Sequence, residues 1–134
     1  YADKQGKDIS ALAFFHIPLL EYESVRNQKS TLGSIEESVC SPSINSGLFS
    51  SFVEMGDVLG VFVGHDHNDD FVGTAANICL RYGRKTGYAS AYHEILERGA
   101  RIIELYETEK KFDTHIRTLA GSSLEYSFSR KSLK

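Results

Sequence analysis

The sequence contains no tryptophan and has only two cysteines, two prolines and one methionine in 134 residues. Cys40 and Cys79 lie far apart and form no CxxC pair, so the sequence indicates neither a disulfide scaffold nor a cysteine zinc site. The two thiols could still form one bridge, and their number does not define the redox compartment. No apolar run approaches the ~18 residues that a membrane-spanning helix needs.

The charge balance argues against further classes of function. A formal net charge of -3 at pH 7 gives no bulk reason to expect binding to nucleic acid or to an anionic membrane. With 41% hydrophobic and 25% charged residues, the chain of 1–134 has the composition of one globular domain. Its opening residues, YADKQGKDIS, include neither an initiator methionine nor the apolar region of a signal peptide. We therefore expect the chain to be a fragment of a longer protein.

Most of the regular structure that the sequence predicts is β-strand. Short apolar or alternating runs, bounded by turn residues, recur through the chain and are typical of strands. The predicted strands are 9–15, 58–63, 71–82, 101–107, 112–120 and 123–128. The run at 58–63 is apolar throughout, which predicts burial on both faces. The strands at 101–107 and 112–120 flank a charged turn and are expected to form an antiparallel hairpin.

One helix is predicted in the segment NSGLFSSFVEMGD, residues 45–57. Ser46 is suited to the N-cap and Gly56 to the C-terminal exit. The apolar face of this helix consists of Leu48, Phe49, Phe52 and Val53. The polar segment 23–46 is predicted either to be an irregular loop or to carry one short helix. The order of elements predicts a mixed α and β protein in which sheet predominates.

Residues 62–71, FVGHDHNDDF, hold the highest density of potential metal ligands in the sequence. The acidic and amide side chains favour a plain turn. A second interpretation is a metal site at the end of the buried strand, because neutral imidazole binds Zn, Fe, Mn or Co, and Gly64 would let the backbone turn sharply. A third is general acid catalysis by a histidine beside a carboxylate.

A second histidine favours the metal interpretation. His16 also follows a predicted strand, and Pro18 fixes the turn after it. Neighbouring strands position the side chains at their ends on one edge of a sheet, and sites collect there because the strands are rigid. Two strands that each end in histidine provide the arrangement that a metal centre requires.

The segments FFHIPLLEY and GVFVGHDHNDDF resemble the C-terminal half of the calcineurin-like metallophosphoesterases, in the branch related to purple acid phosphatases. SPSINSGLFSSFVEMGDV and ERGARIIEL are similar to connecting segments of that branch. The resemblance implies an αββα sandwich, built from two mixed sheets flanked by helices, of which this chain would be the C-terminal half. We therefore expect a sheet-rich, mixed αβ fold with few helices.

The resemblance also implies a dinuclear metal centre that hydrolyses phosphomonoesters or phosphodiesters. In that superfamily a HxP histidine and a GHxH pair supply three ligands, which would place His16 and His65 on one ion and His67 on the other. The two ions would be Fe, Zn or Mn. Asp66 would shape the turn between the ligands. Close relatives have an apolar residue and then Asn-Asp after GHDH, whereas here Asn68 comes one place earlier and Asp69 follows, so the resemblance assigns no role to either residue.

The remaining ligands of the superfamily come from DxH, GDxxD and GNHE segments, and the sequence contains none of them. Without the bridging carboxylate, three neutral imidazoles should hold at most one weakly bound ion. We expect this chain to be inactive alone, and to associate with the missing N-terminal half or with another copy. The alternative is a non-catalytic β-rich module that binds a partner or a single metal. Export from the cytoplasm is implied by the resemblance alone.

Other residues have weaker support as functional groups. Arg84 in YGRKTGY could contact a substrate phosphate through paired donors, although a hairpin turn with solvated Arg84 and Lys85 is the favoured interpretation. His93 and His115 lie in patterned segments and are predicted to be ordinary half-exposed side chains. No Gly-x-Ser-x-Gly motif supports a serine hydrolase.

Overall fold

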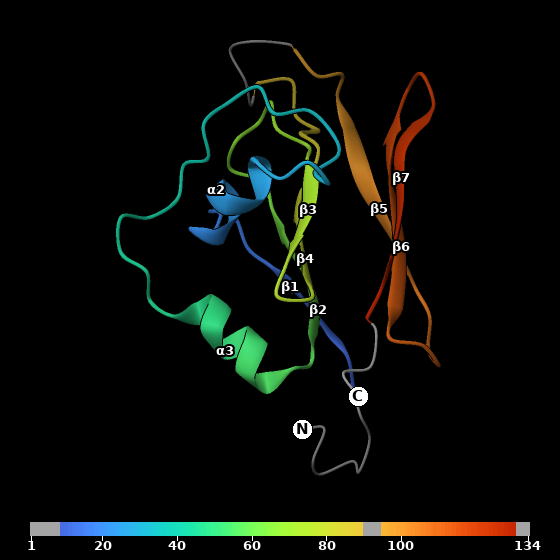
Figure 1. Cartoon of the computed structure of the whole chain (residues 1–134). Coiled ribbons are helices and arrows are strands. Elements are labelled where there is room, and N and C mark those ends of the chain that lie inside the picture. The colour runs from blue at the N-terminus through green and yellow to red at the C-terminus, as the bar shows by residue number, and fades with distance from the viewer. Residues whose placement is uncertain (1–8, 90–94, 131–134) are drawn as a thin grey trace.

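Figure 1 shows three layers in the structure, a computed structural model that describes residues 9–89 and 95–130. The two described helices lie on one face of a four-stranded sheet, and a three-stranded sheet packs against the other face. The elements are β1 (Ala11–Phe14), α2 (Glu21–Arg26), α3 (Leu48–Met55), β2 (Val58–Val63), β3 (Val72–Ala75), β4 (Ile78–Tyr82), β5 (Gly99–Leu105), β6 (Lys111–Thr118) and β7 (Ser122–Ser129). The predicted sheet-rich, mixed αβ fold with few helices is confirmed.

The core is divided between the two faces of the four-stranded sheet. On the helix side, Tyr22 of α2 and Phe49 of α3 pack in one cluster with Val61 of β2. On the opposite side, Phe62 of the same strand contacts Phe112 of β6, with ring centroids 5.8 Å apart. Every residue of β2 is buried because packed layers cover both faces of this strand. The sequence prediction of a strand buried on both sides is confirmed.

Three parallel strands bring the polar loops that follow them to one edge of the sheet. The four-stranded sheet has the order β1-β2-β4-β3, in which β1, β2 and β4 are parallel and β3 is antiparallel. The carboxyl ends of the parallel strands therefore lie along one edge. The loops that leave β1, β2 and β4 at this edge carry His16, His65 and Arg84 respectively.

The prediction of one strand over 71–82 is wrong, because the segment is a hairpin of β3 and β4. Ala76 and Asn77 form the turn, with positive φ angles of 44° and 60°. Two left-handed residues in succession give the twist that a two-residue hairpin needs. The apolar pattern of the segment continues through this turn, which contains no glycine, and the sequence therefore resembles one long strand.

The predicted helix of 45–57 is confirmed as α3, but its cap differs from the prediction. The N-cap residue is Gly47, in a left-handed conformation with φ 78°, and not Ser46. The side chain of Asn45 accepts the N–H of Gly47 at 2.8 Å. Gly56 ends the helix with φ 69°, as predicted. Within the predicted apolar face, Phe49 is buried and Phe52 packs against the core, whereas Leu48 and Val53 are largely exposed.

The polar segment 23–46 contains one short helix, which was one of the two alternatives. This helix, α2, begins slightly earlier, at Glu21, and packs against β3. A Cβ on Gly73 of β3 would lie 2.1 Å from Cγ1 of Val25, so glycine is required for the close approach of helix and strand. Past the helix, the segment has little regular structure.

The second sheet has the order β5-β6-β7, antiparallel throughout. The predicted hairpin and the added third strand are confirmed. Phe112 and Phe128 face the four-stranded sheet, while His115 and Glu125 belong to the half-exposed or exposed residues of β6 and β7. Neither helix in the described part of the chain is long and apolar enough to cross a membrane.

Candidate metal centre

The two histidines that follow β1 and β2 meet at the edge of the four-stranded sheet. Nε2 of His16 lies 3.1 Å from Nδ1 of His65, and the two rings are nearly perpendicular, with centroids 5.0 Å apart. The N–H of Gly64 donates to the carbonyl of His16 at 3.1 Å, which fixes the two strand ends side by side. One of the two facing ring nitrogens donates a hydrogen bond to the other. Without the shared proton, both nitrogens would offer lone pairs to a cation.

His67 does not join that pair in a group of three ligand atoms. Its side chain is half-buried, two residues after His65. Within residues 9–89 and 95–130, the potential metal ligands that gather in a group of three are Cys40, His65 and Asp66, and neither His16 nor His67 belongs to this group. The structure therefore brings two of the three predicted ligand histidines into contact, and His67 does not form a group of three ligand atoms with them.

Gly64 is less constrained than the sequence suggested. Its φ is not positive, and a Cβ there would meet no atom within 4 Å. The sharp turn after β2 is made by the following residues, where the N–H of Asp69 donates to the carbonyl of Asp66 at 3.2 Å.

Asp66 attaches the histidine loop to two other parts of the chain. Its side chain is 2% exposed, and Oδ2 accepts hydrogen bonds from the hydroxyl of Tyr82 at 2.5 Å and from the N–H of Cys40 at 3.2 Å. Burial and this hydrogen bond hold the pKa of Tyr82 well above its usual value of 10. Asp66 therefore fixes two segments relative to His65: the end of β4, and the polar loop between α2 and α3 that contains Cys40.

Asp69 and Asp70 also bind the polar loop through its backbone. Oδ1 of Asp69 accepts the N–H groups of Glu36 at 2.8 Å and Glu37 at 3.0 Å. Oδ1 of Asp70 accepts the N–H of Ser34 at 2.7 Å. Both aspartates are fully buried, and burial raises the pKa of Asp69 above its usual range. These residues form the turn that the sequence predicts, and Asp69 and Asp70 also hold long-range contacts with the polar loop.

Asn68 adds further hydrogen bonds between the histidine loop and the polar loop. Its N–H and Nδ2 donate to one carboxylate oxygen of Glu37 at 3.1 and 2.6 Å, and its Oδ1 accepts from Nζ of Lys85 at 2.8 Å. Asn68 is buried and so is Lys85, at 8% exposed. The structure gives Asn68 a positioning role, where the resemblance to the family assigned none.

The side chain of Arg84 is only 7% exposed, so the favoured interpretation of it as a solvated turn residue is wrong. Its guanidinium forms an ion pair with the buried carboxylate of Asp70 and donates to the carbonyl of Glu97 at 2.7 Å. The remaining donor, Nε, is buried without a hydrogen-bond acceptor in the described part of the chain. Two of the three donor nitrogens of Arg84 are thus already used by the protein.

A pocket of about 540 Å³ opens beside the histidine pair. Its polar lining includes His16, Arg84 and Arg101, and Phe14 and Phe62 provide apolar walls. Arg101 donates to the carbonyls of Tyr82 at 2.7 Å and Asp70 at 3.1 Å, and burial lowers its pKa to about 10. A pocket with two guanidinium groups and one imidazole has the charge and the donors to accept an anion.

The remaining candidates lie elsewhere. His115 is on the second sheet, where a shallow pocket is lined with Glu104 and Glu125, and the prediction that it is an ordinary half-exposed residue is confirmed. His93 lies outside the described residues. Cys40 is exposed and Cys79 is buried, and both are free thiols, so the possible bridge between them is absent.

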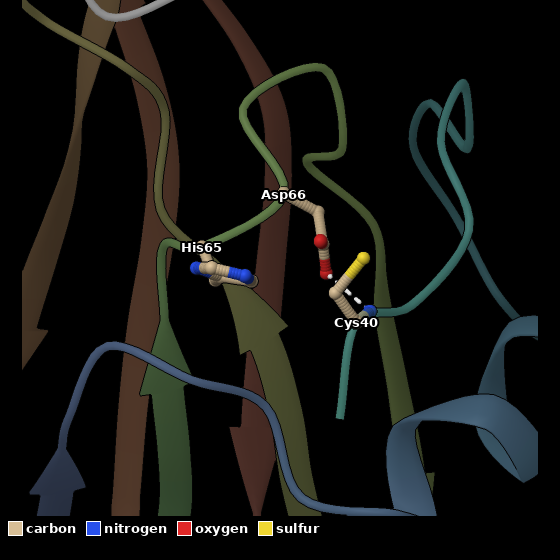
Figure 2. A group of neighbouring side chains, drawn as sticks. All are labelled: Cys40, His65 and Asp66. Atoms are coloured by element: carbon tan, nitrogen blue, oxygen red, sulfur yellow. Dashed lines mark hydrogen bonds between the residues drawn. The ribbon is translucent and has the colours of Figure 1, made fainter. Parts of the chain in front are cut away.

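Cys40 is the member of the site that the sequence did not indicate. Figure 2 shows its side chain beside Asp66, with His65 on the neighbouring part of the loop. A side-chain hydrogen bond with Asp66, together with the charge of that carboxylate, raises the pKa of the Cys40 thiol. The signal in the sequence was weak, because Cys40 and Asp66 are 26 positions apart in segments without periodicity.

Comparison with known proteins supports the purple acid phosphatase-related resemblance. Three Arabidopsis thaliana proteins, named probable inactive purple acid phosphatase 29, 14 and 28, are 40%, 38% and 43% identical to the chain over 100, 100 and 96 residues. These regions cover 75%, 75% and 70% of this chain, but the chain spans only about a quarter of the length of the curated relatives that it matches. No protein-family model matches the sequence, and no solved structure gives a significant match. The chain is thus similar to part of proteins named as probable inactive purple acid phosphatases.

Proposed function

We propose that the chain is the C-terminal part of a metallophosphoesterase that hydrolyses phosphomonoesters or phosphodiesters at a dinuclear metal centre. The observation that carries this proposal is the contact of His16 and His65, whose ring nitrogens lie 3.1 Å apart at the ends of two parallel strands. The similarity to proteins named as probable inactive purple acid phosphatases supports the family, though not the catalysis, in this proposal.

The donor chemistry of the histidines fits part of such a centre. His16 and His65 would hold one ion, and His67, two residues further along the loop, would hold the other. Neutral imidazoles do not offset the repulsion of two cations, so the bridging carboxylate and the remaining ligands would come from outside this chain. Two ions, of Fe, Zn or Mn, would supply a hydroxide nucleophile and offset the charge that develops on the phosphate.

The residues of this chain would position the phosphoester. The pocket beside His16 places the guanidinium groups of Arg84 and Arg101 where phosphate oxygens would approach. The ion pair of Arg84 with Asp70 would orient the guanidinium, and the aromatic walls would exclude water from one side of the pocket.

The second candidate is a non-catalytic module. The relatives carry names that describe them as probably inactive, and the site in this chain lacks the carboxylate that a dinuclear centre needs. In this alternative the two sheets and the polar loop would serve binding, and His16 and His65 would be a plain hydrogen-bonded pair.

Hydrolysis of p-nitrophenyl phosphate by a longer protein that carries this chain separates the two candidates. The phosphatase proposal expects activity with Mn, Fe or Zn supplied, and loss of nearly all of it in His65→Ala. The matched control is His115→Ala, a histidine on the second sheet, which should retain the activity. A longer protein that is inert with all three metals would refute catalysis, and equal losses in the two variants would refute the site.

We also propose that the remaining part of the phosphatase docks on the open side of the sandwich. β1 and β5 are edge strands in the described residues, and a pocket of about 850 Å³ lies between them. Its apolar lining includes Leu12, Phe14 and Leu105, of which Phe14 and Leu105 are 63% and 69% exposed. Exposed apolar side chains beside two unpaired strand edges are typical of a surface that another chain segment covers.

Light scattering of this chain tests the docking proposal. A chain that lacks its covering segment should self-associate through this surface, and Phe14→Ser with Leu105→Ser should shift it toward monomer. Leu119→Ser, at a residue that is 97% exposed on the β6–β7 turn, is the matched control and should leave the association unchanged. A parent chain that is monodisperse and monomeric would contradict the proposal.

A further inference from the structure

Three side chains of different chemistry converge beside the histidine pair. One ligand atom each from Cys40, His65 and Asp66 lies within 4.8 Å of the other two. The three come from two segments, since Cys40 belongs to the polar loop after α2 and the others follow β2 (Figure 2). Sulfur, nitrogen and oxygen donors from separate segments therefore surround one small volume.

Hydrogen bonds of the backbone hold this arrangement in place. The N–H of Cys40 donates to Oδ2 of Asp66 at 3.2 Å, so the thiol cannot move far from the carboxylate. Asp69 binds the same loop three residues earlier, at the N–H of Glu37. The hydrogen bonds from the hydroxyl of Tyr82 and from the N–H of Cys40 both end on Oδ2 of Asp66, which leaves Oδ1 as the ligand atom for a cation.

The contact with His16 also orients the imidazole of His65. Nδ1 of His65 faces Nε2 of His16, which is outside the group of three. Metal-binding histidines are typically oriented by a partner on the nitrogen that does not bind the metal. His16 would have that role here, and the other nitrogen of His65 would be available to a cation between Cys40 and Asp66.

The donor set selects the class of cation. A thiolate with imidazole and carboxylate suits Zn²⁺ and the similar ion Co²⁺, whereas Mg²⁺ and Ca²⁺ prefer oxygen ligands alone. Metal–ligand distances of ~2.0–2.3 Å require ligand atoms roughly 3.3–3.8 Å apart, so the present spacing, within 4.8 Å, would have to contract by up to about 1.5 Å. Cys40 can make that movement because its side chain is exposed.

We propose that the chain binds one thiophilic divalent cation through Cys40, His65 and Asp66, with His16 positioning the imidazole. The thiolate and the carboxylate supply two negative charges, which the three-histidine set lacks. This site uses no ligand from outside the chain and requires no catalysis, so it goes beyond the proposed phosphatase function. Because His65 belongs to both sites, a cation held here would compete with the dinuclear centre for that histidine.

Titration of the reduced chain with Co²⁺ tests the proposal, because a cobalt–thiolate bond gives a charge-transfer band in the near ultraviolet. The band should saturate at one equivalent, and Zn²⁺ should displace the Co²⁺. Cys40→Ser should abolish the band and weaken Co²⁺ binding by at least about tenfold. Cys79→Ser is the matched control, since it removes the other thiol, which is buried, and should keep the band.

A second measurement follows the thiol itself. In the Cys79→Ser chain, Cys40 is the single cysteine, and saturating Zn²⁺ should slow its reaction with an aromatic disulfide reagent at least about tenfold. His65→Ala should remove that protection. Unchanged reactivity with Zn²⁺, or a Cys40→Ser chain that binds Co²⁺ as the parent does, would overturn the proposal. Neither result bears on hydrolysis by the longer protein, so the two proposals can fail separately.

Discussion

The hydroxyl of Tyr82 donates a 2.5 Å hydrogen bond to Oδ2 of Asp66, and both side chains are buried. Tyr82 is the last residue of β4, and Asp66 follows His65 in the loop after β2, so this contact ties two strand ends together. A buried carboxylate that loses a hydrogen-bond donor keeps an unsatisfied acceptor, which costs free energy. We therefore expect Tyr82→Phe to lower the free energy of unfolding by roughly 1–3 kcal/mol in urea denaturation.

The control for Tyr82→Phe is Tyr88→Phe, which removes a hydroxyl from a side chain that is 79% exposed. That variant should unfold at the parent's urea concentration. Equal stability of Tyr82→Phe and the parent would mean that the hydrogen bond to Asp66 contributes nothing net, and that the polar loop is held by other contacts.

The buried ion pair of Arg84 and Asp70 leads to a second prediction. Their side chains are 7% and 0% exposed, so Arg84→Met would leave an uncompensated carboxylate in the interior. Loss of one member of a buried pair costs about 3–5 kcal/mol. We expect that loss in the free energy of unfolding for Arg84→Met, measured by chemical denaturation.

A double variant tests the origin of this loss. Arg84→Met with Asp70→Asn removes the buried charge and keeps Oδ1 for the N–H of Ser34, so it should recover a large part of the stability. The matched control is Arg26→Met, whose partner Glu23 is 55% exposed and which should cost less than about 1 kcal/mol. A double variant no more stable than Arg84→Met would show that lost packing, and not the stranded charge, dominates.

Gly73 gives a third prediction, about the packing of α2. The missing Cβ would lie 2.1 Å from Cγ1 of Val25, a buried side chain, so Gly73→Ala must displace the helix or the strand. Overpacking of this kind costs typically 1–3 kcal/mol. Thermal unfolding should therefore show a lower midpoint for Gly73→Ala than for the parent.

The comparison variant is Gly64→Ala, at a glycine whose Cβ would meet no atom within 4 Å. It should unfold close to the parent's temperature. A Gly73→Ala chain as stable as Gly64→Ala would mean that α2 moves away from β3 at little cost, which its tight packing in the structure does not suggest.

Much of the fold follows from apolar patterning in the sequence. Residues 58–63 predict a strand buried on both faces, and β2 is such a strand because helices cover one side and the second sheet covers the other. The meeting of His16 and His65 could also be anticipated, since both follow strands and parallel neighbours end at one edge.

The errors have local physical causes. The turn at Ala76 and Asn77 was missed because both residues take left-handed conformations without a glycine to indicate it. Side-chain preference predicts Ser46 as the cap, whereas Gly47 adopts the cap conformation and the side chain of Asn45 accepts its N–H.

The approach of Cys40 to His65 could not be predicted from the sequence. It depends on Asp66 and Asp69, whose carboxylates bind backbone N–H groups of a loop about thirty positions earlier. Side-chain to backbone contacts of this kind leave no periodic signal, because any residue other than proline can supply the N–H. The acidic residues that resemble a plain turn in the sequence are therefore those that assemble the site.

Asp113 of β6 leads to a prediction about pH. Hydrogen bonds with Ser127 and Tyr106, and the nearby charge of Lys111, lower its pKa below the usual value of 3.8. A carboxylate whose folded-state pKa is depressed stabilises the fold above its unfolded pKa, and this stabilisation is lost as the pH falls through the folded-state value. Asp113→Asn should therefore lower the free energy of unfolding at about pH 6, and the difference from the parent should shrink toward about pH 3.

Tyr106→Phe separates the hydroxyl's part of this effect. It removes the donor that lies 2.6 Å from Oδ2 of Asp113 and keeps the ring, so it should reproduce part of the loss at the higher pH and again converge with the parent in acid. Urea unfolding at both pH values measures the differences directly. If Asp113→Asn costs the same at both, the ionised form of Asp113 has no preferential interaction in the fold, and the second sheet does not derive acid sensitivity from this cluster.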